Sequence, residues 1–132
     1  YAAATVPRLC VVLRKAYGGA YIVMDSRGLG ADWVIAWPTA EIAVMGGPPA
    51  VRVLYRRHLD AITDTGARAR EQAALELEYS ERFLSPYVAA ERGYVDDVVA
   101  ASDTRRMLAG ALERFATKRE HQPHRRHSNT PL

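Results

Sequence analysis

Residues 14–21 read Arg-Lys-Ala-Tyr-Gly-Gly-Ala-Tyr and join a predicted strand to a predicted helix. The apolar run at residues 9–13 predicts a buried strand, and residues 20–25 can begin a helix. A Gly-Gly pair by itself usually marks a plain turn. At this place, however, two residues without a Cβ let the backbone approach a ligand. The first amides of a helix have no partner within it, and the helix dipole favours negative charge there, so the turn can serve as an oxyanion hole.

The rest of the chain alternates between predicted strands and predicted helices. Continuous apolar runs, typical of strands covered on both faces, predict strands at residues 8–13, 32–37, 42–45 and 95–99. Helices are predicted at residues 20–25, 50–59, 67–84 and 88–92, and from Ser102 or Asp103 onward. The alternation predicts an α/β protein.

Two of these helices carry specific expectations about their ends and faces. We expect Gly28 and Gly30 to close the first helix. The helix at residues 67–84 is amphipathic, and its covered stripe is predicted to consist of Ala73, Leu77, Ser80 and Leu84. In the last helix, Leu108, Ala111 and Phe115 share one face.

Charge and composition limit the class of protein. The chain has 132 residues, 48% of them hydrophobic, and a net charge of +3. The tail at residues 118–132 carries a surplus of the same size, so the remainder is neutral and nucleic-acid binding is not expected. The longest apolar runs are too short to cross a bilayer, so no membrane partner is expected.

Cysteine and histidine usage points to no metal centre. The single Cys10 lies in an apolar run and is predicted to be a buried small hydrophobe in a reducing compartment. His121, His124 and His127 recur every third residue, but Pro123 interrupts any helix that could align them. No carboxylate or thiolate cluster supports a metal site there, and we predict none.

Three further blocks accompany the Gly-Gly turn. They read Trp-Pro-Thr-Ala-Glu-Ile-Ala-Val-Met-Gly at residues 37–46, Pro-Tyr-Val-Ala-Ala-Glu-Arg-Gly-Tyr-Val-Asp at 86–96, and Arg-Arg-His-Ser-Asn-Thr-Pro-Leu at 125–132. In this order and spacing, the four blocks resemble the C-terminal end of the carboxyltransferase β subunit of biotin-dependent acyl-CoA carboxylases, of the propionyl-CoA and acetyl-CoA carboxylase type. The resemblance covers nearly the whole chain and is weakest at residues 61–71.

The resemblance implies a fold and a domain division. The family has the crotonase-like (ClpP/crotonase) superhelix of repeated strand–strand–helix units, so this chain is expected to form only its C-terminal part. Residues 1–117 would belong to the C-domain of the carboxyltransferase, and residues 118–132 would form a basic C-terminal tail that is solvated or packs on another subunit. Because the family's chains are several times longer, we expect this chain to be a fragment that is inactive alone.

The resemblance also implies an activity, a site and partners. The family moves a carboxyl group from carboxybiotin, held on a carrier protein, to the α-carbon of an acyl-CoA. By this resemblance the backbone amides of Gly19 and Ala20 are catalytic, because they stabilise the biotin ureido oxygen. Gly18, Tyr21 and Ile22 would contact substrate. The implied partners are an α subunit with biotin carboxylase and biotin carboxyl carrier parts, and further copies in a hexamer whose active sites lie between two subunits. The implied compartment is the cytoplasm, or the mitochondrial matrix in a eukaryote.

Several positions depart from the family or leave alternatives open. Relatives specific for propionyl-CoA tend to carry an aspartate or another small polar group where this chain has Ile22. An isoleucine there either lines the acyl pocket, which would allow other acyl groups, or merely packs in the core. Pro48-Pro49 and Ser128 also differ from the usual residues. A decarboxylase or transcarboxylase of the same fold, or a non-catalytic assembly module, are the alternative functions.

No side-chain general base is predicted. Asp25 and Ser26 can simply end a helix, Glu41 can orient a turn, and His58 is expected on a solvated helix face. No nucleophile–histidine spacing stands out.

Overall fold

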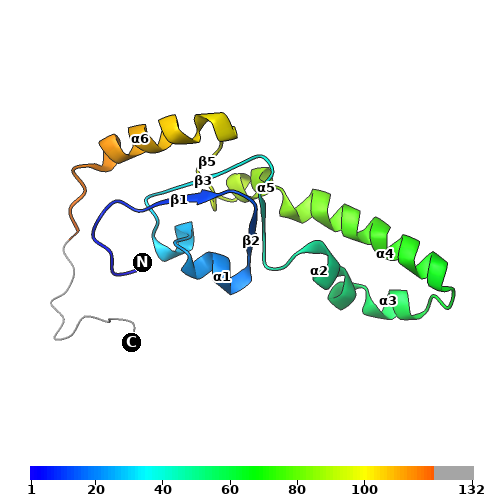
Figure 1. Cartoon of the computed structure of the whole chain (residues 1–132). Coiled ribbons are helices and arrows are strands. Elements are labelled where there is room, and N and C mark those ends of the chain that lie inside the picture. Colours follow the sequence, from blue (N-terminus) through cyan, green and yellow to red (C-terminus); the bar gives the residue numbers. More distant parts are fainter. Residues whose placement is uncertain (121–132) are drawn as a thin grey trace, which may run out of the picture.

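The computed structural model describes residues 1–120, and two small parallel sheets form its centre (Figure 1). The first sheet has the order β1 (Leu9–Val12), β3 (Trp33–Ala36) and β5 (Asp97–Val98). The second pairs β2 (Lys15–Tyr17) with β4 (Glu41–Ala43). The predicted strands are therefore present, although shorter than the apolar runs. The sequence analysis missed β2, because three residues that include a lysine give no apolar run.

The first sheet carries the most deeply buried residues. Val34 and Ile35 of β3 are both 0% exposed, which confirms that this strand is covered on both faces. Its neighbour β1 is only half covered, apart from Val12. Cys10 of β1 is likewise half-buried rather than fully buried, and burial raises the pKa of its thiol, with a smaller contribution from the Asp25 charge.

The chain turns from β2 directly into α1 (Gly18–Val23), as the sequence predicted for a strand-to-helix turn. The helix is shorter than expected at its C-terminal end. Asp25, with φ of +69°, already lies outside it, so the prediction that Gly28 and Gly30 close this helix is wrong. Gly30, with φ of +96°, instead ends a separate 3₁₀ turn, η1 (Arg27–Leu29).

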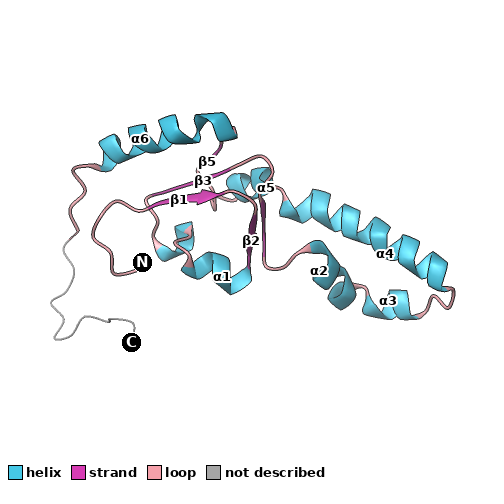
Figure 2. Cartoon of the chain, in the orientation of Figure 1, coloured by secondary structure: helices cyan, strands magenta, loops and turns pink. Residues whose placement is uncertain are grey.

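A helical arm, residues 47–79, extends away from the sheets (Figures 1 and 2). It comprises α2 (Gly47–Leu54), α3 (Arg56–Asp60) and α4 (Thr65–Tyr79). The prolines stand in the first turn of α2, as expected, but Tyr55 separates α2 from α3 where one helix was predicted. Asp64 caps α4 by accepting a hydrogen bond from the Ala67 amide at 2.6 Å.

The predicted stripe of α4 is not covered in this structure. The helix contains no buried residue, and Leu77 is 62% exposed. After Tyr79 the chain widens into a π-helical turn, η2 (Ser80–Leu84), in which Leu84 alone is buried. The prediction of one regular helix over residues 67–84 is therefore wrong at its C-terminal end. The stripe prediction holds for Leu84 and in part for the half-buried Ser80, but not for Ala73 and Leu77.

The remaining helices lie before and after β5, the last strand of the first sheet. Helix α5 (Pro86–Glu91) leads to β5, and η3 (Ala101–Asp103) leads to α6 (Thr104–Phe115). In α6, Ala111 is buried and Leu108 and Phe115 are half-buried, in agreement with the predicted face. The indole of Trp37 donates to the Thr104 hydroxyl at 2.9 Å and ties α6 to the end of β3.

The start of the predicted tail is attached to the rest of the molecule. The Lys118 ammonium donates to the Asp32 carboxylate at 2.9 Å, and the same carboxylate accepts the Arg8 backbone amide at 2.7 Å. Burial opposes this ionised state of Asp32, yet these bonds hold the pKa of its carboxyl below the ordinary value. Lys118 is therefore not freely solvated. The three tail histidines and Ser128 lie outside the described residues.

Candidate functional site

The Gly-Gly turn lies where the second sheet meets α1. Tyr17 is the last residue of β2 and the N-cap of α1, but its side chain caps no amide of the helix. Its hydroxyl instead hydrogen-bonds the Glu41 carboxylate across the β2–β4 pair. Burial, followed by this bond to Glu41, raises the pKa of Tyr17 to about 12. The amides that open α1 therefore receive no side-chain cap and remain available to another acceptor.

The backbone requires glycine at only one of the two glycine positions of the turn. Gly18 has φ of +59°, and a Cβ there would lie 3.0 Å from the Val44 carbonyl oxygen. The backbone itself therefore demands glycine at position 18. Gly19 has an ordinary φ, and a Cβ there would meet nothing within 4 Å. The fold does not need glycine at position 19, so its missing side chain leaves open space in front of the helix N-terminus.

A pocket of about 490 Å³ lies beside this turn. Its wall from α1 and the following loop includes Gly18, Tyr21 and Ile22, three residues that the sequence analysis assigned to substrate contact. Gly19 and Ala20 are exposed next to it but are not part of its lining. Ile22 is 53% exposed at the pocket wall, so it does not pack in the core that the described residues form.

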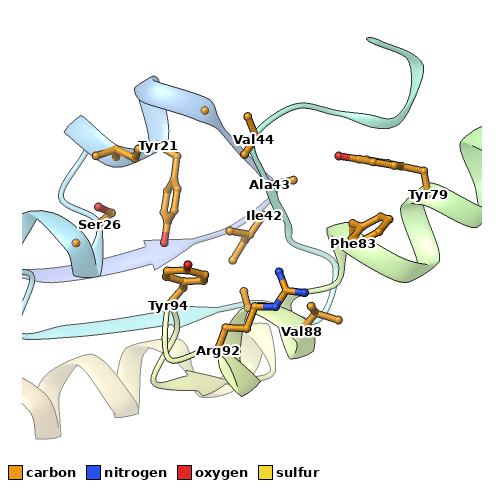
Figure 3. A pocket seen from close by; sticks show the side chains of 14 residues that line it. Tyr21, Ser26, Ile42, Ala43, Val44, Tyr79, Phe83, Val88, Arg92 and Tyr94 are labelled. Carbon is orange, nitrogen blue, oxygen red and sulfur yellow. The ribbon is translucent and has the colours of Figure 1, made fainter. Parts of the chain in front are cut away.

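The opposite walls come from segments far away in the sequence (Figure 3). The pocket is lined mainly by apolar and aromatic side chains, a usual composition for a small-molecule site. Its further lining residues are Ser26, Gly28, Ile42, Ala43, Val44, Tyr79, Phe83, Val88, Ala89, Arg92 and Tyr94. The Tyr79 and Phe83 rings lie 5.1 Å apart at the junction of α4 and η2, where the π-helical turn sets their relative position.

Sequence reasoning did not find these opposite walls. Arg92 and Tyr94 belong to the block at residues 86–96 that carried the family resemblance, but no local pattern places them beside residue 21. Tyr79 and Phe83 are four residues apart, which predicts a shared helix face and says nothing about a pocket. Only the packing of α5 and η2 against β4 brings these residues to the turn.

Tyr21 combines a buried hydroxyl with the absence of a protein partner. Among the residues that the structure describes, its oxygen has no hydrogen-bond partner, and the side chain points into the pocket toward Tyr94 (Figure 3). Burial raises the pKa of Tyr21, with a smaller contribution from Cys10. The surrounding protein covers the hydroxyl oxygen, so it is a buried polar atom rather than an open donor in the pocket.

The loop behind α1 is held by a buried ion pair. The Arg8 guanidinium lies 3.0 Å from the Asp25 carboxylate, and both residues are less than a tenth exposed. Arg8 also donates to the carbonyl oxygens of Leu29 and Gly30. Asp25 is thus a structural residue that positions the segment from α1 to η1, which agrees with leaving it out of the catalytic candidates.

The other residues set aside by the sequence analysis also have structural surroundings. Ser26 is buried in the pocket wall, and Glu41 accepts the Tyr17 hydroxyl. His58 is exposed on the helical arm, as predicted, and lies 2.9 Å from the Glu71 carboxylate. Within residues 1–120, no three histidine, cysteine or acidic side chains are grouped as metal ligands. No helix in this range is long and apolar enough to cross a membrane.

Comparisons with known proteins agree with the resemblance seen in the sequence. The family described as the carboxyl transferase domain matches residues 1–130. The methylmalonyl-CoA carboxyltransferase 12S subunit of Propionibacterium freudenreichii subsp. shermanii is 53% identical over 99% of this chain and 24% of its own length. The carboxyltransferase subunit of propionyl-CoA carboxylase from Haloferax mediterranei is 54% identical over 100% of this chain and 25% of its own.

The fold comparison gives the same family. A solved structure of the hexameric transcarboxylase 12S core, with methylmalonyl-coenzyme A and methylmalonic acid bound, is similar to this chain with a TM-score of 0.87 and 52% sequence identity. The match covers 100% of this chain and 25% of the chain in that structure. The predicted α/β, crotonase-like fold is thereby confirmed for a part of that structure's length. The chain spans about a quarter of the length of the curated relatives it matches.

Proposed function

Because this chain belongs to the carboxyl transferase domain family, we propose that it is a segment of a biotin-dependent carboxyltransferase subunit. The longer subunit would move a carboxyl group from carboxybiotin to the α-carbon of an acyl-CoA such as propionyl-CoA, acetyl-CoA or a longer homologue. The observation that carries this proposal is the open space at Gly19, beside uncapped helix amides and a pocket of about 490 Å³.

The proposed catalytic groups are the backbone amides of Gly19 and Ala20. Biotin would supply the carboxyl group, and negative charge develops on its ureido oxygen when that group departs. Donors placed in advance at such an oxygen stabilise the charge, and losing one donor lowers turnover by roughly 10²–10³ in other enzymes. Gly18 supplies the left-handed backbone of the turn, and the absent Gly19 side chain would leave room for the ring of the cofactor.

Access at Gly19 can be tested separately from stability. Gly19→Val in the full-length subunit should lower carboxyl transfer by at least about 10²-fold, because the branched side chain fills the space before the donors. Gly110→Val on α6 is the matched control, since a Cβ at Gly110 also meets nothing within 4 Å. Both variants should have similar melting temperatures. Equal activity of the two variants would contradict the role of the turn.

Ile22 is proposed to influence which acyl group is accepted. It is an exposed apolar side chain at the pocket wall, and one methylene of fit is worth about 1–3 kcal/mol in discrimination. Ile22→Asp should shift the ratio of kcat/KM between propionyl-CoA and longer acyl-CoA by about tenfold or more. Val23→Asp is the control, because Val23 is similarly exposed but does not line the pocket. An unchanged acyl-length profile in Ile22→Asp would end this proposal.

Two related functions and one different class compete with the carboxylase. Relatives named for carboxyl transfer from methylmalonyl-CoA and for propionyl-CoA carboxylation are equally similar to this chain, so identity does not choose between a transcarboxylase and a carboxylase. A biotin-dependent decarboxylase would use the same turn. A non-catalytic assembly module is less well supported, because it has no use for open space at Gly19.

The proposed partners follow from the same function. They are an α subunit with biotin carboxylase and biotin carboxyl carrier parts, and further copies of the subunit in a hexamer like that of the transcarboxylase 12S core. We place the enzyme in the cytoplasm, or in the mitochondrial matrix in a eukaryote.

The decisive experiment is carboxyl transfer from methylmalonyl-CoA to free biotin by the full-length subunit, with the 132-residue chain as control. We expect turnover by the full-length subunit and none by the short chain. A well-folded subunit that is inactive with both methylmalonyl-CoA and malonyl-CoA would favour the assembly module instead.

A further inference from the structure

Apolar burial does not hold the pocket wall that runs from α1 through η1. Neither of these two elements contains a buried residue, and Ile22 and Val23 are more than half exposed. Within residues 18–30, only Asp25 and Ser26 are buried. A segment with few buried apolar contacts opens easily unless other bonds hold it. The position of this wall therefore depends on its polar contacts.

The Arg8 side chain makes polar contacts at both ends of one part of the wall, residues 26–28, whose first and last members line the pocket. Before this part, the Arg8 guanidinium lies 3.0 Å from the Asp25 carboxylate. After it, the same guanidinium donates to the carbonyl oxygens of Leu29 and Gly30. One side chain thus holds the wall from both directions along the chain.

The backbone of Arg8 is itself fixed to the first sheet. Its amide donates to the Asp32 carboxylate at 2.7 Å, and its carbonyl oxygen accepts the Asp32 amide at 2.9 Å. The side chains of Arg8 and Asp25 are only 8% and 10% exposed, so water screens their attraction little. The ion pair therefore connects the wall to the most deeply buried part of the molecule.

Two local features of the backbone accommodate this ion pair. Asp25 has a left-handed φ of +69°, which is uncommon for a residue with a Cβ. A Cβ at Gly30 would lie only 2.7 Å from an Nη atom of Arg8. Unfavourable backbone conformations persist where the surrounding structure imposes them. Both features are therefore expected where the chain is shaped around the guanidinium.

A second ion pair of the wall is more exposed. The Arg27 guanidinium lies 3.0 Å from the Asp96 carboxylate, and these side chains are 43% and 25% exposed. Ion pairs that water reaches contribute little. The buried pair of Arg8 and Asp25 is therefore the main anchor of the wall.

We propose that Arg8 and Asp25 are positioning residues, and that the acyl-length preference of the pocket depends on the wall that their ion pair holds. Neither residue lines the pocket, so both act through the wall. The inference rests on the proposed function, in which Ile22 of this wall influences which acyl group is accepted. Selection by length requires a wall held in place, because a loose wall adapts to a longer or shorter chain.

A double variant separates the position of the wall from the stability of the fold. Arg8→Met alone leaves the Asp25 carboxylate buried without its partner and should lower the melting temperature strongly. Adding Asp25→Asn removes the second charge, and asparagine tolerates a left-handed φ, so the melting temperature should largely recover. The anchor stays broken in this double variant. A pair that only stabilises the fold predicts wild-type selectivity once stability returns.

The first measurement is carboxyl transfer to free biotin by the full-length subunit. Malonyl-, methylmalonyl- and ethylmalonyl-CoA serve as donors, because each differs from the next by one methylene. In the double variant, the ratios of kcat/KM between neighbouring donors should move toward one by about three- to tenfold. Arg8→Lys keeps a charge beside Asp25 without the forked geometry, so its ratios should change in the same direction but less. These ratios do not depend on the fraction of folded enzyme.

The second measurement is hydrogen exchange, which reports on the wall without any activity. In the double variant, amides of residues 18–29 should exchange at least about tenfold faster, while those of β1 and β3 stay unchanged. Ile35→Val is the control. Its neighbour Val34 belongs to the core cluster against which Tyr21 packs, and Ile35 points to the other face of β3. This variant should lower the melting temperature without changing wall exchange or selectivity.

The outcomes separate this inference from the proposed function. Unchanged selectivity in the double variant, or a wild type without length preference, would overturn the inference. Altered selectivity in Ile35→Val would also overturn it, because any loss of stability would then suffice. A wild-type subunit that transfers from none of the three donors would refute the proposed function. Hydrogen exchange would then still test the anchor, and unchanged exchange in the double variant would show that the pair does not hold the wall.

Discussion

Two regions of the molecule differ in how they are packed. The strand body, which consists of the two sheets with α1 and α5, buries its central residues. The helical arm at residues 47–79 covers only one side of its helices. In the body, Val34 and Ile35 are fully buried between strands and helices. In the arm, α2 and α3 bury Val51 and Leu59, but α4 buries nothing and Leu77 is 62% exposed. The body can therefore position a site by its own packing, while the arm adds only a rim, through Tyr79, to the pocket.

The ion pairs of the body and of the arm also differ in burial. The ion pair between Arg8 and Asp25 lies inside the body, where removing one partner leaves a buried charge. The pairs of the arm, such as Arg68 with Asp60 at 2.8 Å, are exposed and contribute little to stability. We therefore expect single substitutions to destabilise the fold more in the body than in the arm.

Matched truncations should show the largest difference between the two regions. Ile35→Ala should lower the free energy of unfolding by about 2–5 kcal/mol, because it leaves a cavity in a fully buried site. Leu77→Ala on α4 should change it by less than about 0.5 kcal/mol, as is usual for exposed positions. Urea unfolding of the 132-residue chain, followed by circular dichroism, measures both values. Similar losses would show that α4 is as well packed as the body.

A smaller contrast is expected within the body, between the two glycines of the turn. Gly18→Ala should cost about 1–2 kcal/mol, because its φ of +59° is left-handed. Gly19→Ala should instead stabilise the chain by up to about 1 kcal/mol, since it reduces the freedom of the unfolded chain at a helical position with open space. Melting temperatures of the two variants test this. A destabilised Gly19→Ala would mean that the turn needs both glycines for folding, which would remove the argument from access.

The last expected effect concerns alkaline pH. Tyr17, whose pKa is raised to about 12, keeps its proton in the folded state at pH values where the unfolded tyrosine, with a pKa of about 10, has lost it. Stability should therefore fall as the pH rises from about 10 toward 12. Tyr17→Phe should flatten this part of the profile, measured by urea unfolding at a series of pH values. Tyr55→Phe in the arm is the control, and an equal flattening there would contradict the assignment to Tyr17.

Part of the site was predictable because its signals are local. The Gly-Gly turn follows an apolar run and precedes a helix, and the covalent chain alone requires these residues to be adjacent. Gly18, Tyr21 and Ile22 are found together at the pocket for the same reason. The steric difference between Gly18 and Gly19 was not predictable. It depends on the Val44 carbonyl, which lies close to Gly18 only because β2 pairs with β4.

The mistaken boundaries have a common cause. A period of 3.6 residues predicted one helix over residues 67–84, yet the chain leaves α geometry at Ser80, whose hydroxyl bonds the Glu76 carbonyl at 2.8 Å. The predicted stripe assumed that an apolar face is covered, which the sequence cannot guarantee for Leu77. Strand β2 was missed because its stability comes from pairing with β4 rather than from an apolar pattern.

The sequence by itself therefore determined the strand–helix alternation, the family and the turn that opens α1, because periodicity, glycine placement and adjacent blocks are properties of neighbours along the chain. Only the tertiary structure decided that Arg92 and Tyr94 face Tyr21 across a pocket and that Gly19, not Gly18, is free of steric demands. The first fact depends on residues about 70 positions apart, and the second on the Val44 carbonyl, which is distant from Gly18 in the sequence. Such contacts form only when sheets and helices pack to bury apolar surface.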